Sequence, residues 1–571
     1  MSLKIRDTIE ECDVLVVGGG IAGLMAAIAA GGHSDSVLLA DKGDTRRSGS
    51  GATGNDHFVC FIPEVHGADA LQEILDEMND SMIGGNADSE LQRMFLSRTF
   101  EVVKDWDTWG INMQPHGYYE FNGHAFPERK RIFLKYDGHN QKAVLTKEAR
   151  KRNVRLLNKT PILEFLKNDA DEIIGAIGLS LLAEEPELVL ISCKAIIAAT
   201  GNTSRLYPSI TPSQLFNTAH CPGNAGAGRA AAYRAGAKLI NLEIPNAHAG
   251  PKYFERCGKA TWTGVIADTT GKAIGPFVDR PTKELGDITA DVWLSVFSDK
   301  MKDGTGPVYM NCTQTSPEDM EYMKWGLTCE GDTSLLDAMD AQGIDLSKDM
   351  VEFTKYRPML IGRGIQIDAQ AATNIKGLYA AGDEVGNFRC DISGAAIFGR
   401  IAGENAARFV RDARAQSHNL HTHPVVRQKT EFIEQLLSHA GGAGWQEFNQ
   451  GIQQILNDYA GIEYVRSEPL LQAGLQYLAQ LEKNAREEIS VRTSHDLMRA
   501  LECFDLLQIG RLLCLCALER KETRGLHKRS DYPFTNPLLS KKMLMIFTDE
   551  NQAPVVQWRS MNQEYGTKPV L

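Results

Sequence analysis

The stretch Cys12-Asp-Val-Leu-Val-Val-Gly-Gly-Gly-Ile-Ala-Gly-Leu-Met-Ala-Ala-Ile-Ala-Ala30 decides the fold of this chain. Residues 13–17 form the continuous apolar run of a buried parallel strand, and Gly18, Gly20 and Gly23 follow it as G-x-G-x-x-G. Glycines in such a turn let the backbone approach a pyrophosphate, and the helix that starts there favours an anion. The stretch therefore predicts a dinucleotide-binding strand, turn and helix.

A second apolar strand supports this interpretation. The run Ser36-Val-Leu-Leu-Ala40 ends at Asp41, eighteen residues beyond Gly23, where a carboxylate can accept hydrogen bonds from an adenosine ribose. This order favours dinucleotide binding over a turn that carries glycine for steric reasons alone. The motif by itself does not distinguish FAD from NAD.

The composition is that of a globular enzyme with two or three domains: 571 residues, 43% of them hydrophobic and 23% charged. The net charge of −12 and the lack of a long basic run predict no nucleic-acid partner. Eleven scattered cysteines lack the spacing of metal ligands or of an iron–sulfur array, so we expect no metal site and buried thiols. No secretory signal or membrane-spanning segment is visible, which favours a cytoplasmic protein without direct membrane insertion.

Three further segments, far apart in the sequence, belong to the same nucleotide site. Residues 195–201 form an apolar strand that stops at a Thr-Gly pair, as expected where backbone passes close to a nucleotide. Residues 377–383 repeat this pattern and end at Asp383, which is suited to bind a ribityl hydroxyl. Residues 393–403 predict a helix whose N-terminal amides approach a flavin ring. Together these segments indicate a large flavin domain.

With these segments on view, the chain resembles the flavoprotein subunits of the succinate dehydrogenase and fumarate reductase family, which includes L-aspartate oxidase and the alpha chain of adenylylsulfate reductase. The resemblance runs from about Cys12 to Pro533 and includes Phe398-Gly-Arg-Ile-Ala-Gly403 and Arg520-Lys-Glu-Thr-Arg-Gly-Leu-His-Lys-Arg-Ser-Asp-Tyr-Pro533. It implies an FAD-dependent oxidoreductase that acts on a small anion and exchanges electrons with an iron–sulfur (ferredoxin-type) partner. It also implies a capping domain that closes the active site.

We therefore predict an α/β fold in which an FAD-binding Rossmann-like domain carries an inserted α+β capping domain and is followed by a C-terminal helical domain. The expected boundaries are 1–242 and 356–424 for the FAD-binding domain, 243–355 for the cap and 425–571 for the helical domain. Apolar residues three and four apart predict helices in the last part, over 431–437, 448–459, 470–488 and 494–518.

The cofactor is predicted to be FAD held without a covalent bond. Succinate dehydrogenases attach the flavin to a histidine, whereas Ser48 stands at that place here, as a serine does in adenylylsulfate reductase. The residues expected to contact the cofactor come from the segments above: Gly18, Gly20, Ile21, Ala22, Gly23, Asp41, Lys42, Ser48, Gly49, Gly51, Ala52, Thr200, Gly201, Gly382, Asp383, Ser393, Gly394 and Ala395.

Four residues are candidates for catalysis. His248 matches a family histidine that donates a hydrogen bond to a substrate oxyanion, and its alternative is a buried structural role. Arg280 matches the proton-transferring arginine of the cap, and its alternative is a surface arginine. Arg389 stands where a family arginine clamps the substrate, and a guanidinium binds carboxylate, sulfate and phosphate alike. His57 follows the glycine turn and is a further candidate for the flavin's reactive side.

One departure from the family pattern keeps the substrate open. Met359 stands near the position of a second substrate histidine in fumarate reductases, and a thioether cannot replace an imidazole as a hydrogen-bond donor. The loop around Arg389 matches adenylylsulfate reductase in length, although a histidine stands at that place there. The alternatives are a chain like the alpha chain of adenylylsulfate reductase that acts on a sulfur compound, an amino-acid or amine oxidase, and a non-catalytic flavin-binding protein.

Overall fold

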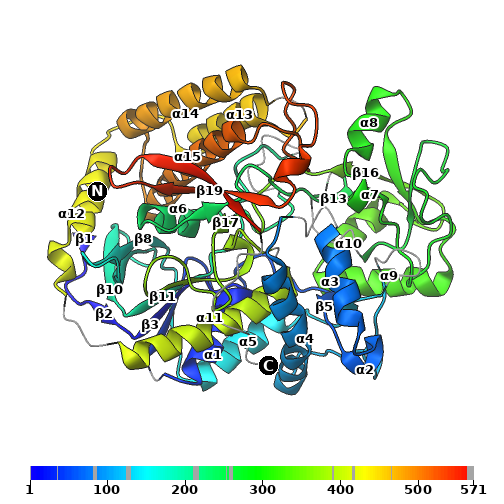
Figure 1. Ribbon diagram of the computed structural model, residues 1–571, viewed down its shortest axis with the longest axis horizontal. Coiled ribbons are helices and arrows are strands. Elements are labelled where there is room, and N and C mark those ends of the chain that lie inside the picture. Colours follow the sequence, from blue (N-terminus) through cyan, green and yellow to red (C-terminus); the bar gives the residue numbers. More distant parts are fainter. Residues whose placement is uncertain are drawn as a thin grey trace.

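A five-stranded parallel sheet forms the centre of the nucleotide-binding half (Figure 1). The computed structural model describes residues 2–34, 36–80, 86–123, 130–209, 218–252, 254–255, 261–388, 391–413, 418–463 and 466–561. The strand order is β18 (Leu378–Ala380), β11 (Ala195–Ala198), β3 (Val14–Val17), β4 (Val37–Asp41) and β7 (Arg155–Asn158). Every residue of the first four strands in this order is buried, because helices cover both faces of a parallel sheet. The strands predicted from the four nucleotide-site segments are confirmed.

Two helices rich in small residues lie side by side along this sheet, α1 (Ile21–Gly31) and α11 (Ile392–Asp412) (Figure 1). A Cβ atom on Gly399 would lie 2.3 Å from the carbonyl oxygen of Ala22, and one on Gly403 would lie 2.2 Å from that of Ala26. Glycine at these two positions therefore lets the two helix backbones touch. The neighbouring helices α4 (Ser89–Trp109) and α5 (Gln141–Lys151) complete this layer.

A second, mostly antiparallel sheet packs beside the first. It contains β1 (Lys4–Ile5), β2 (Glu10–Glu11), β10 (Glu187–Ser192), β9 (Ile173–Ser180) and β8 (Ile162–Lys167). Helix α6 (Ala227–Arg234) lies against β8, and its Arg229 donates a hydrogen bond to the backbone of Gly201 at the end of β11. Further small elements of this half include β5 (His57–Val59), β6 (Phe133–Lys135), α2 (Pro63–His66), α3 (Ala70–Asp80) and η2 (Gly382–Glu384).

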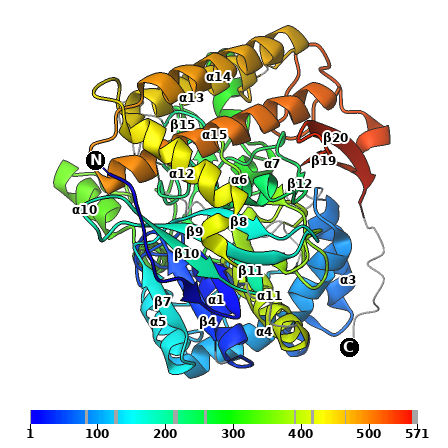
Figure 2. The same cartoon turned by 90° about the vertical axis from the view of Figure 1, so that its left-hand side faces the viewer.

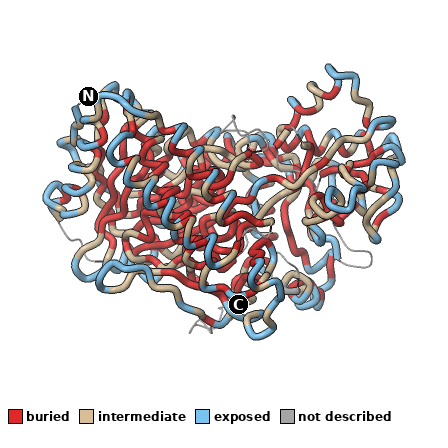
Figure 3. Tube along the Cα trace, turned by 90° about the horizontal axis from the view of Figure 1, so that it is seen from above, coloured by how far each residue is buried: buried red, intermediate tan, exposed pale blue. Residues whose placement is uncertain are grey.

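The elements between residues 249 and 355 form the cap lobe, which projects on one side of the molecule (Figures 1 and 3). Its antiparallel sheet has the order β13 (Ala249–Pro251), β16 (Val351–Lys355), β15 (Val308–Asn311) and β14 (Val265–Ala267), and its helices are α7 (Thr289–Val292), α8 (Val296–Lys302), α9 (Pro317–Glu330) and α10 (Thr333–Gln342). Trp262, Met323, Leu327 and Phe353 belong to an apolar core separate from that of the nucleotide-binding half. This mixture of helices and strands is the expected α+β cap.

Four helices near the C-terminus confirm the predicted helical segments and stack over the nucleotide-binding half (Figure 2). They are α12 (Pro424–Leu437), α13 (Trp445–Ala460), α14 (Glu468–Glu488) and α15 (Ser494–Glu519), flanked by η3 (Leu420–Thr422) and η4 (Pro537–Leu539). The side chain of Thr493 accepts a hydrogen bond from the amide of Asp496 and so caps α15. No helix in the described ranges combines the length and the apolar character needed to cross a membrane.

The C-terminal part also contains a β-hairpin that the expectation of a purely helical domain did not include. Strands β19 (Lys542–Thr548) and β20 (Pro554–Ser560) pair with each other, and β19 also pairs with β12 (Leu239–Ile240) of the nucleotide-binding half, which pairs in turn with β17 (Gly364–Ile365). The short strand β12 therefore gains a partner that lies about three hundred residues away in the sequence.

Candidate functional site

A cavity of about 2260 Å³ lies between the nucleotide-binding half and the cap lobe. Its wall contains all the strand ends and turns predicted to meet the nucleotide, and the cap contributes Ile288, Ala290 and Glu330. The continuous stretches along it include residues 17–22, 40–44, 47–55, 159–163, 199–201, 219–227, 244–249 and 381–383. This volume and shape are sufficient for a dinucleotide together with a small second ligand.

Each glycine of the opening turn meets different surroundings. Gly18 has φ +102°, and a Cβ atom there would lie 2.4 Å from the carbonyl oxygen of Ala199. A Cβ atom on Gly23 would lie 1.7 Å from the carbonyl oxygen of Gly18, whereas one on Gly20 would have no neighbour within 4 Å. The turn is therefore closed on the protein side and open toward the cavity, as a pyrophosphate requires.

The carboxylate of Asp41 braces this turn. One of its oxygens accepts a hydrogen bond of 2.6 Å from the amide of Gly19, and the other accepts one of 2.7 Å from the amide of Gly43. Each oxygen can accept a second hydrogen bond, so ribose binding by Asp41 stays a prediction. The buried ammonium of Lys142 donates to the carbonyl of Gly19, and burial lowers the pKa of Lys142 to about 8. No sequence pattern marks Lys142, which stands in an ordinary helix.

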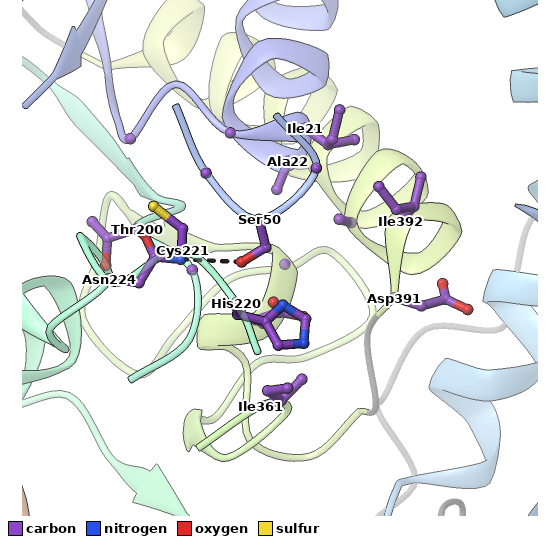
Figure 4. Close-up of a pocket in the computed structure, with 18 of the residues that line it drawn as sticks. Ile21, Ala22, Ser50, Thr200, His220, Cys221, Asn224, Ile361, Asp391 and Ile392 are labelled. Carbon is purple, nitrogen blue, oxygen red and sulfur yellow. Dashed lines mark hydrogen bonds between the residues drawn. The ribbon is translucent and has the colours of Figure 1, made fainter. Parts of the chain in front are cut away.

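The loop 48–52 and the start of α11 form the part of the cavity predicted to hold the flavin ring (Figure 4). Ser48 donates a 3.2 Å hydrogen bond to the carbonyl of Gly19. The hydroxyl of Ser50 accepts hydrogen bonds from the side-chain amides of Asn202 at 3.2 Å and Asn224 at 3.5 Å. Figure 4 shows Ser50 pointing toward the cavity. Asp391 caps α11 by accepting from the amide of Gly394 at 3.0 Å. Sequence reasoning had selected the neighbours of Ser50 but not Ser50 or its two asparagines.

Arg229 on α6 ties the strand ends around the cavity together. Its guanidinium is fully buried and donates to the carbonyls of Gly201 at 2.6 Å, Arg363 at 2.7 Å and Leu360 at 3.2 Å, and also to that of Asp383. Burial lowers the pKa of Arg229 to about 10, although the nearby carboxylates of Glu384 and Asp383 oppose that shift. One side chain thereby fixes backbone from three remote segments.

Most of the predicted cofactor residues lie on the cavity wall. They are Gly18, Gly20, Ile21, Ala22, Asp41, Lys42, Ser48, Gly49, Gly51, Ala52, Thr200, Gly201, Gly382, Asp383 and Ala395. Gly23, Ser393 and Gly394 stand behind this wall and support it through the packing of α1 and the capping of α11.

His248 also lies on the cavity wall, where it meets a histidine that the sequence did not single out. The Nε2 atoms of His248 and His220 are 3.2 Å apart, and their ring centroids are 5.1 Å apart. Desolvation lowers the pKa of His220 to about 4, so His220 is neutral at pH 7. Figure 4 shows His220 pointing into the cavity.

His57 lies on the wall as predicted and belongs to a buried polar cluster. Its Nδ1 atom is 2.5 Å from a carboxylate oxygen of Asp56, whose other oxygen accepts a hydrogen bond of 2.7 Å from Lys135. Glu330 reaches the same imidazole from the cap lobe, with 3.7 Å between its carboxyl oxygen and Nδ1 of His57. Neither Glu330 nor Lys135 carried a signal in the sequence.

The two remaining candidates are Arg280 and Arg389. Arg280 is exposed and is not part of the cavity wall, and Arg389 lies outside the described residues. Met359 is buried in a small apolar cluster, and its backbone pairs with Asn246. Arg363, four residues after Met359, is not among the site residues predicted from the sequence. It lines the cavity, is almost fully buried, and donates to the carbonyls of Ile244 and Gly362 at 2.6 and 2.7 Å.

The sequence profile of the FAD-binding domain family matches residues 13–390, and that of the fumarate reductase flavoprotein C-terminal family matches residues 449–569. One subunit of the fumarate reductase (CoM/CoB) of Methanothermobacter marburgensis is 25% identical, with the match covering 94% of this chain and 97% of that one. The L-aspartate oxidase of Vibrio cholerae is 24% identical over 92% of this chain and 97% of its own length. The solved structure of adenylylsulfate reductase from Archaeoglobus fulgidus has the same fold, with a TM-score of 0.82, 21% identity and coverage of 99% of this chain and 98% of that chain.

Proposed function

The chain belongs to the flavoprotein family of succinate dehydrogenase and fumarate reductase, and we propose that it transfers electrons between its FAD and a small anionic substrate bound under the cap lobe. The protein is an FAD-dependent oxidoreductase. FAD supplies hydride chemistry when it is bound, and the chain supplies orientation, charge and protons. The residues around the glycine turn and the strand ends fit FAD, because they leave an open groove with buried cations and amides along it.

The position of Arg363 is the observation that carries the proposal for an anion. Its guanidinium is buried in the cavity wall, and its hydrogen bonds to the backbone carbonyls of Ile244 and Gly362 orient it there. His248 and Asn246 line the same part of the wall and add polar groups. A buried guanidinium with polar neighbours is suited to bind a carboxylate or a sulfur oxyanion.

The proposal leaves the anion at the level of a class. The side chain of Met359 is in an apolar cluster and contributes no donor to the cavity, so the pair of substrate histidines expected for a dicarboxylate is incomplete at this position. Arg280 and Arg389 stay predictions from the family resemblance. A small carboxylate and a sulfur oxyanion both fit the donor set of Arg363 and His248.

We further propose that electrons pass to or from an iron–sulfur protein. The described cysteines are all free, and all but Cys221 are buried. They do not form the group of thiolates that an internal cluster would need, so the electron acceptor or donor is expected to be a separate molecule.

We propose that FAD is held without a covalent bond. Ser48 occupies the position of the family's flavin-linking histidine, and its hydroxyl is used in a hydrogen bond to Gly19. After precipitation with acid, the flavin should therefore stay in the supernatant. Flavin in the washed pellet would contradict this.

An anion panel tests the main proposal. Purified holoprotein is titrated with succinate, fumarate, L-aspartate, sulfite and adenylyl sulfate while the flavin spectrum is recorded. At least one anion should shift, bleach or reoxidise the flavin with saturation. Arg363→Met should raise the Kd of that anion about 30-fold, since hydrogen bonds to charged groups contribute about 1.5–3 kcal/mol.

Arg408→Met, at an exposed position of α11, is the matched control and should leave this Kd unchanged. Arg280→Met in the same assay tests the family prediction for that residue, which requires loss of turnover with retained anion binding. A flavin that responds to none of the anions, reduced or oxidised, would refute the proposal and favour a non-catalytic flavin-binding protein.

A further inference from the structure

Lys142 on α5 places an ammonium group behind the glycine turn of the nucleotide site. The residue is 2% exposed, and its Nζ atom donates a hydrogen bond to the carbonyl of Gly19, which also accepts one of 3.2 Å from the hydroxyl of Ser48. The amide of the same glycine donates to Asp41 at 2.6 Å. Gly19 lines the cavity, whereas Lys142 does not. The ammonium therefore lies directly behind the cavity wall and holds the peptide group in front of it.

The charge of Lys142 is not neutralised by a carboxylate in contact with it. Within the described part of the chain, its hydrogen-bond acceptor is a neutral carbonyl, and no Asp or Glu forms an ion pair with it. An ammonium removed from water without an anion is costly. Desolvation accordingly lowers the pKa of Lys142 to about 8, although Asp41 and Asp44 oppose that shift. In the flavin-free protein, the ammonium and the neutral amine are therefore equally populated near pH 8.

The groups that act on this ammonium come from two directions. Asp41 ends β4 and Asp44 follows it, and the thiol of Cys221 approaches from the loop before α6. Helix α1, which packs against α5, contains no charged residue. Other charged groups of this region are paired elsewhere: Lys42 with Glu502, Asp105 of α4 with Arg400, and Glu148 of α5 with Lys151 and Arg152.

The cavity side of the turn is suited to the missing negative charge. Helix α1 begins at Ile21 after Gly20, which has no side chain to cap it, so the first amides of the helix can bind an anion. A pyrophosphate bound there would bring two negative charges to the turn that Lys142 contacts from behind. In a site from which water is excluded, such an attraction acts over several ångströms, across the intervening peptide group.

We propose that Lys142 is the counter-ion of the FAD pyrophosphate and that binding of the cofactor is accompanied by uptake of a proton at its Nζ atom. The proton comes from the solvent and forms the third N–H bond of the ammonium, and no electron is transferred. Lys142 acts in this way as a positioning residue, because it touches the turn and not the reacting part of the flavin. The inference concerns cofactor binding and goes beyond the proposed reaction with an anion.

Calorimetry measures the proton uptake directly. FAD is titrated into flavin-free protein at pH 7 and at pH 8.5, each in two buffers that differ in ionisation enthalpy, and the difference in heat gives the number of protons taken up. We expect about 0.1 proton per FAD at pH 7 and about 0.7 at pH 8.5, because binding raises the protonated fraction of the amine. ADP-ribose, which has the pyrophosphate but no flavin ring, should take up as many.

The Kd of FAD should depend on pH for the same reason. In the wild type it should rise about 15-fold from pH 7 to pH 9.5, where the amine has lost its proton before binding. Lys142→Met removes the charge and should raise this Kd about 30-fold at pH 7 but only about 2-fold at pH 9.5, without proton uptake at pH 8.5. Lys147→Met, at an exposed position of the same helix, is the matched control and should behave as the wild type.

A purely structural role of Lys142 predicts a different pattern. Because Ser48 still donates to the carbonyl of Gly19 in Lys142→Met, urea unfolding of this flavin-free variant should show no loss of stability at pH 7. Lower stability together with a loss of FAD affinity that is the same at every pH would overturn the proposal.

Three results of the calorimetry would also overturn it. The first is uptake below about 0.2 proton per FAD by the wild type at pH 8.5, which decides the question even if Lys142→Met does not fold. The second is uptake with FAD but none with ADP-ribose, which would assign the proton to the flavin ring. The third is uptake that is lost in Cys221→Ser and kept in Lys142→Met, which would assign it to the thiol.

Discussion

Gly23 and Gly20 belong to the same turn, yet a methyl group added at each meets opposite surroundings. At Gly23 it would lie 1.7 Å from a backbone oxygen, and at Gly20 it would have no neighbour within 4 Å. Gly23→Ala should destabilise the flavin-free protein by about 2–3 kcal/mol because the backbone must move. Gly20→Ala, at φ −68°, should leave that stability within about 0.5 kcal/mol and weaken FAD binding instead.

Urea unfolding of flavin-free protein and titration with FAD separate these two effects. The two variants serve as controls for each other, because they make the same chemical change three residues apart in one turn. An equal loss of stability in both would contradict the assignment of Gly23 to packing and Gly20 to the cofactor.

His220, which also lines the cavity, makes the free energy of unfolding depend on pH. Desolvation lowers its pKa from about 6.5 in the unfolded chain to about 4 in the folded protein. The folded state therefore favours the neutral ring, so this stability is complete above pH 6.5 and is lost as the pH falls toward 4. The loss should be about 1.4 kcal/mol per pH unit over that range.

The measurement is urea unfolding at several pH values between 4 and 7.5. His220→Gln should flatten the pH dependence by about 3 kcal/mol over the range, since glutamine does not titrate there. His421→Gln, which changes an exposed histidine, should show the same pH dependence of the free energy of unfolding as the wild type. Parallel curves for the wild type and His220→Gln would show that the imidazole is not desolvated.

At the scale of elements, the strands and helices were predictable where their signal is local. The continuous apolar run at 13–17 and the spacing of apolar residues in 494–518 each depend on neighbouring residues only, and both became the expected element. Strand β19 was missed, because a short apolar run does not distinguish a strand from a helix and its partner β12 is far away in the sequence. The same holds in the candidate site, where the glycine turn was predictable from its local sequence pattern and Arg229 was not.

Arg229 on α6 illustrates why the sequence did not show the rest of the site. Its chain neighbours form an ordinary alanine-rich helix, and its function depends on carbonyl groups that arrive from residues 201, 360, 363 and 383. Lys142 and the cap residue Glu330 are similar cases. A single polar residue gains such a function only through the tertiary fold.

Arg229→Lys tests whether the hydrogen bonds of Arg229 hold these segments together. Lysine keeps the charge but replaces five N–H groups in a rigid fork by one ammonium, so most of the hydrogen bonds to the four carbonyl groups should be lost. We expect a loss of about 3 kcal/mol in urea unfolding and at least a tenfold weaker binding of FAD. Four carbonyl oxygens would compete for a single ammonium.

Arg234→Lys on the same helix is the matched control. Arg234 pairs with the carboxylates of Glu164 at 2.7 Å and Asp505 at 2.9 Å, and a lysine can still pair with a carboxylate. It should therefore lose less stability and keep FAD affinity. If both variants behave alike, the carbonyl contacts of Arg229 do not fix the strand ends.

At the scale of the whole molecule, buried ion pairs join the C-terminal part to the nucleotide-binding half. Arg520 is fully buried and donates to Glu243 and Glu522, both at 2.7 Å. Glu243 begins the segment that leads to His248, so the charged run 520–533 supports the cavity wall through Arg520. Lys42 pairs with Glu502 of α15 at 2.6 Å on the same side.

The hairpin β19–β20 is joined to the rest by a further buried pair. Arg559 on β20 donates two hydrogen bonds to Asp88, the residue before α4, at 2.5 and 3.2 Å. Asp88 also accepts a 2.8 Å hydrogen bond from Asn387, near the loop that leads to α11. The pair therefore connects the end of the described chain with two segments around the nucleotide-binding core.

Arg559→Met should destabilise the protein by about 3–5 kcal/mol, because it leaves the carboxylate of Asp88 buried without its cation. Adding Asp88→Asn should recover part of this loss, since a neutral amide has a smaller desolvation cost. A double-mutant cycle in urea unfolding measures the coupling. Arg46→Met removes an exposed pair with Asp44 and should cost less than about 1 kcal/mol. If the double variant loses the sum of the two single losses, Arg559 stabilises the molecule through its packing alone, and the hairpin is held by the β12–β19 pairing rather than by charge.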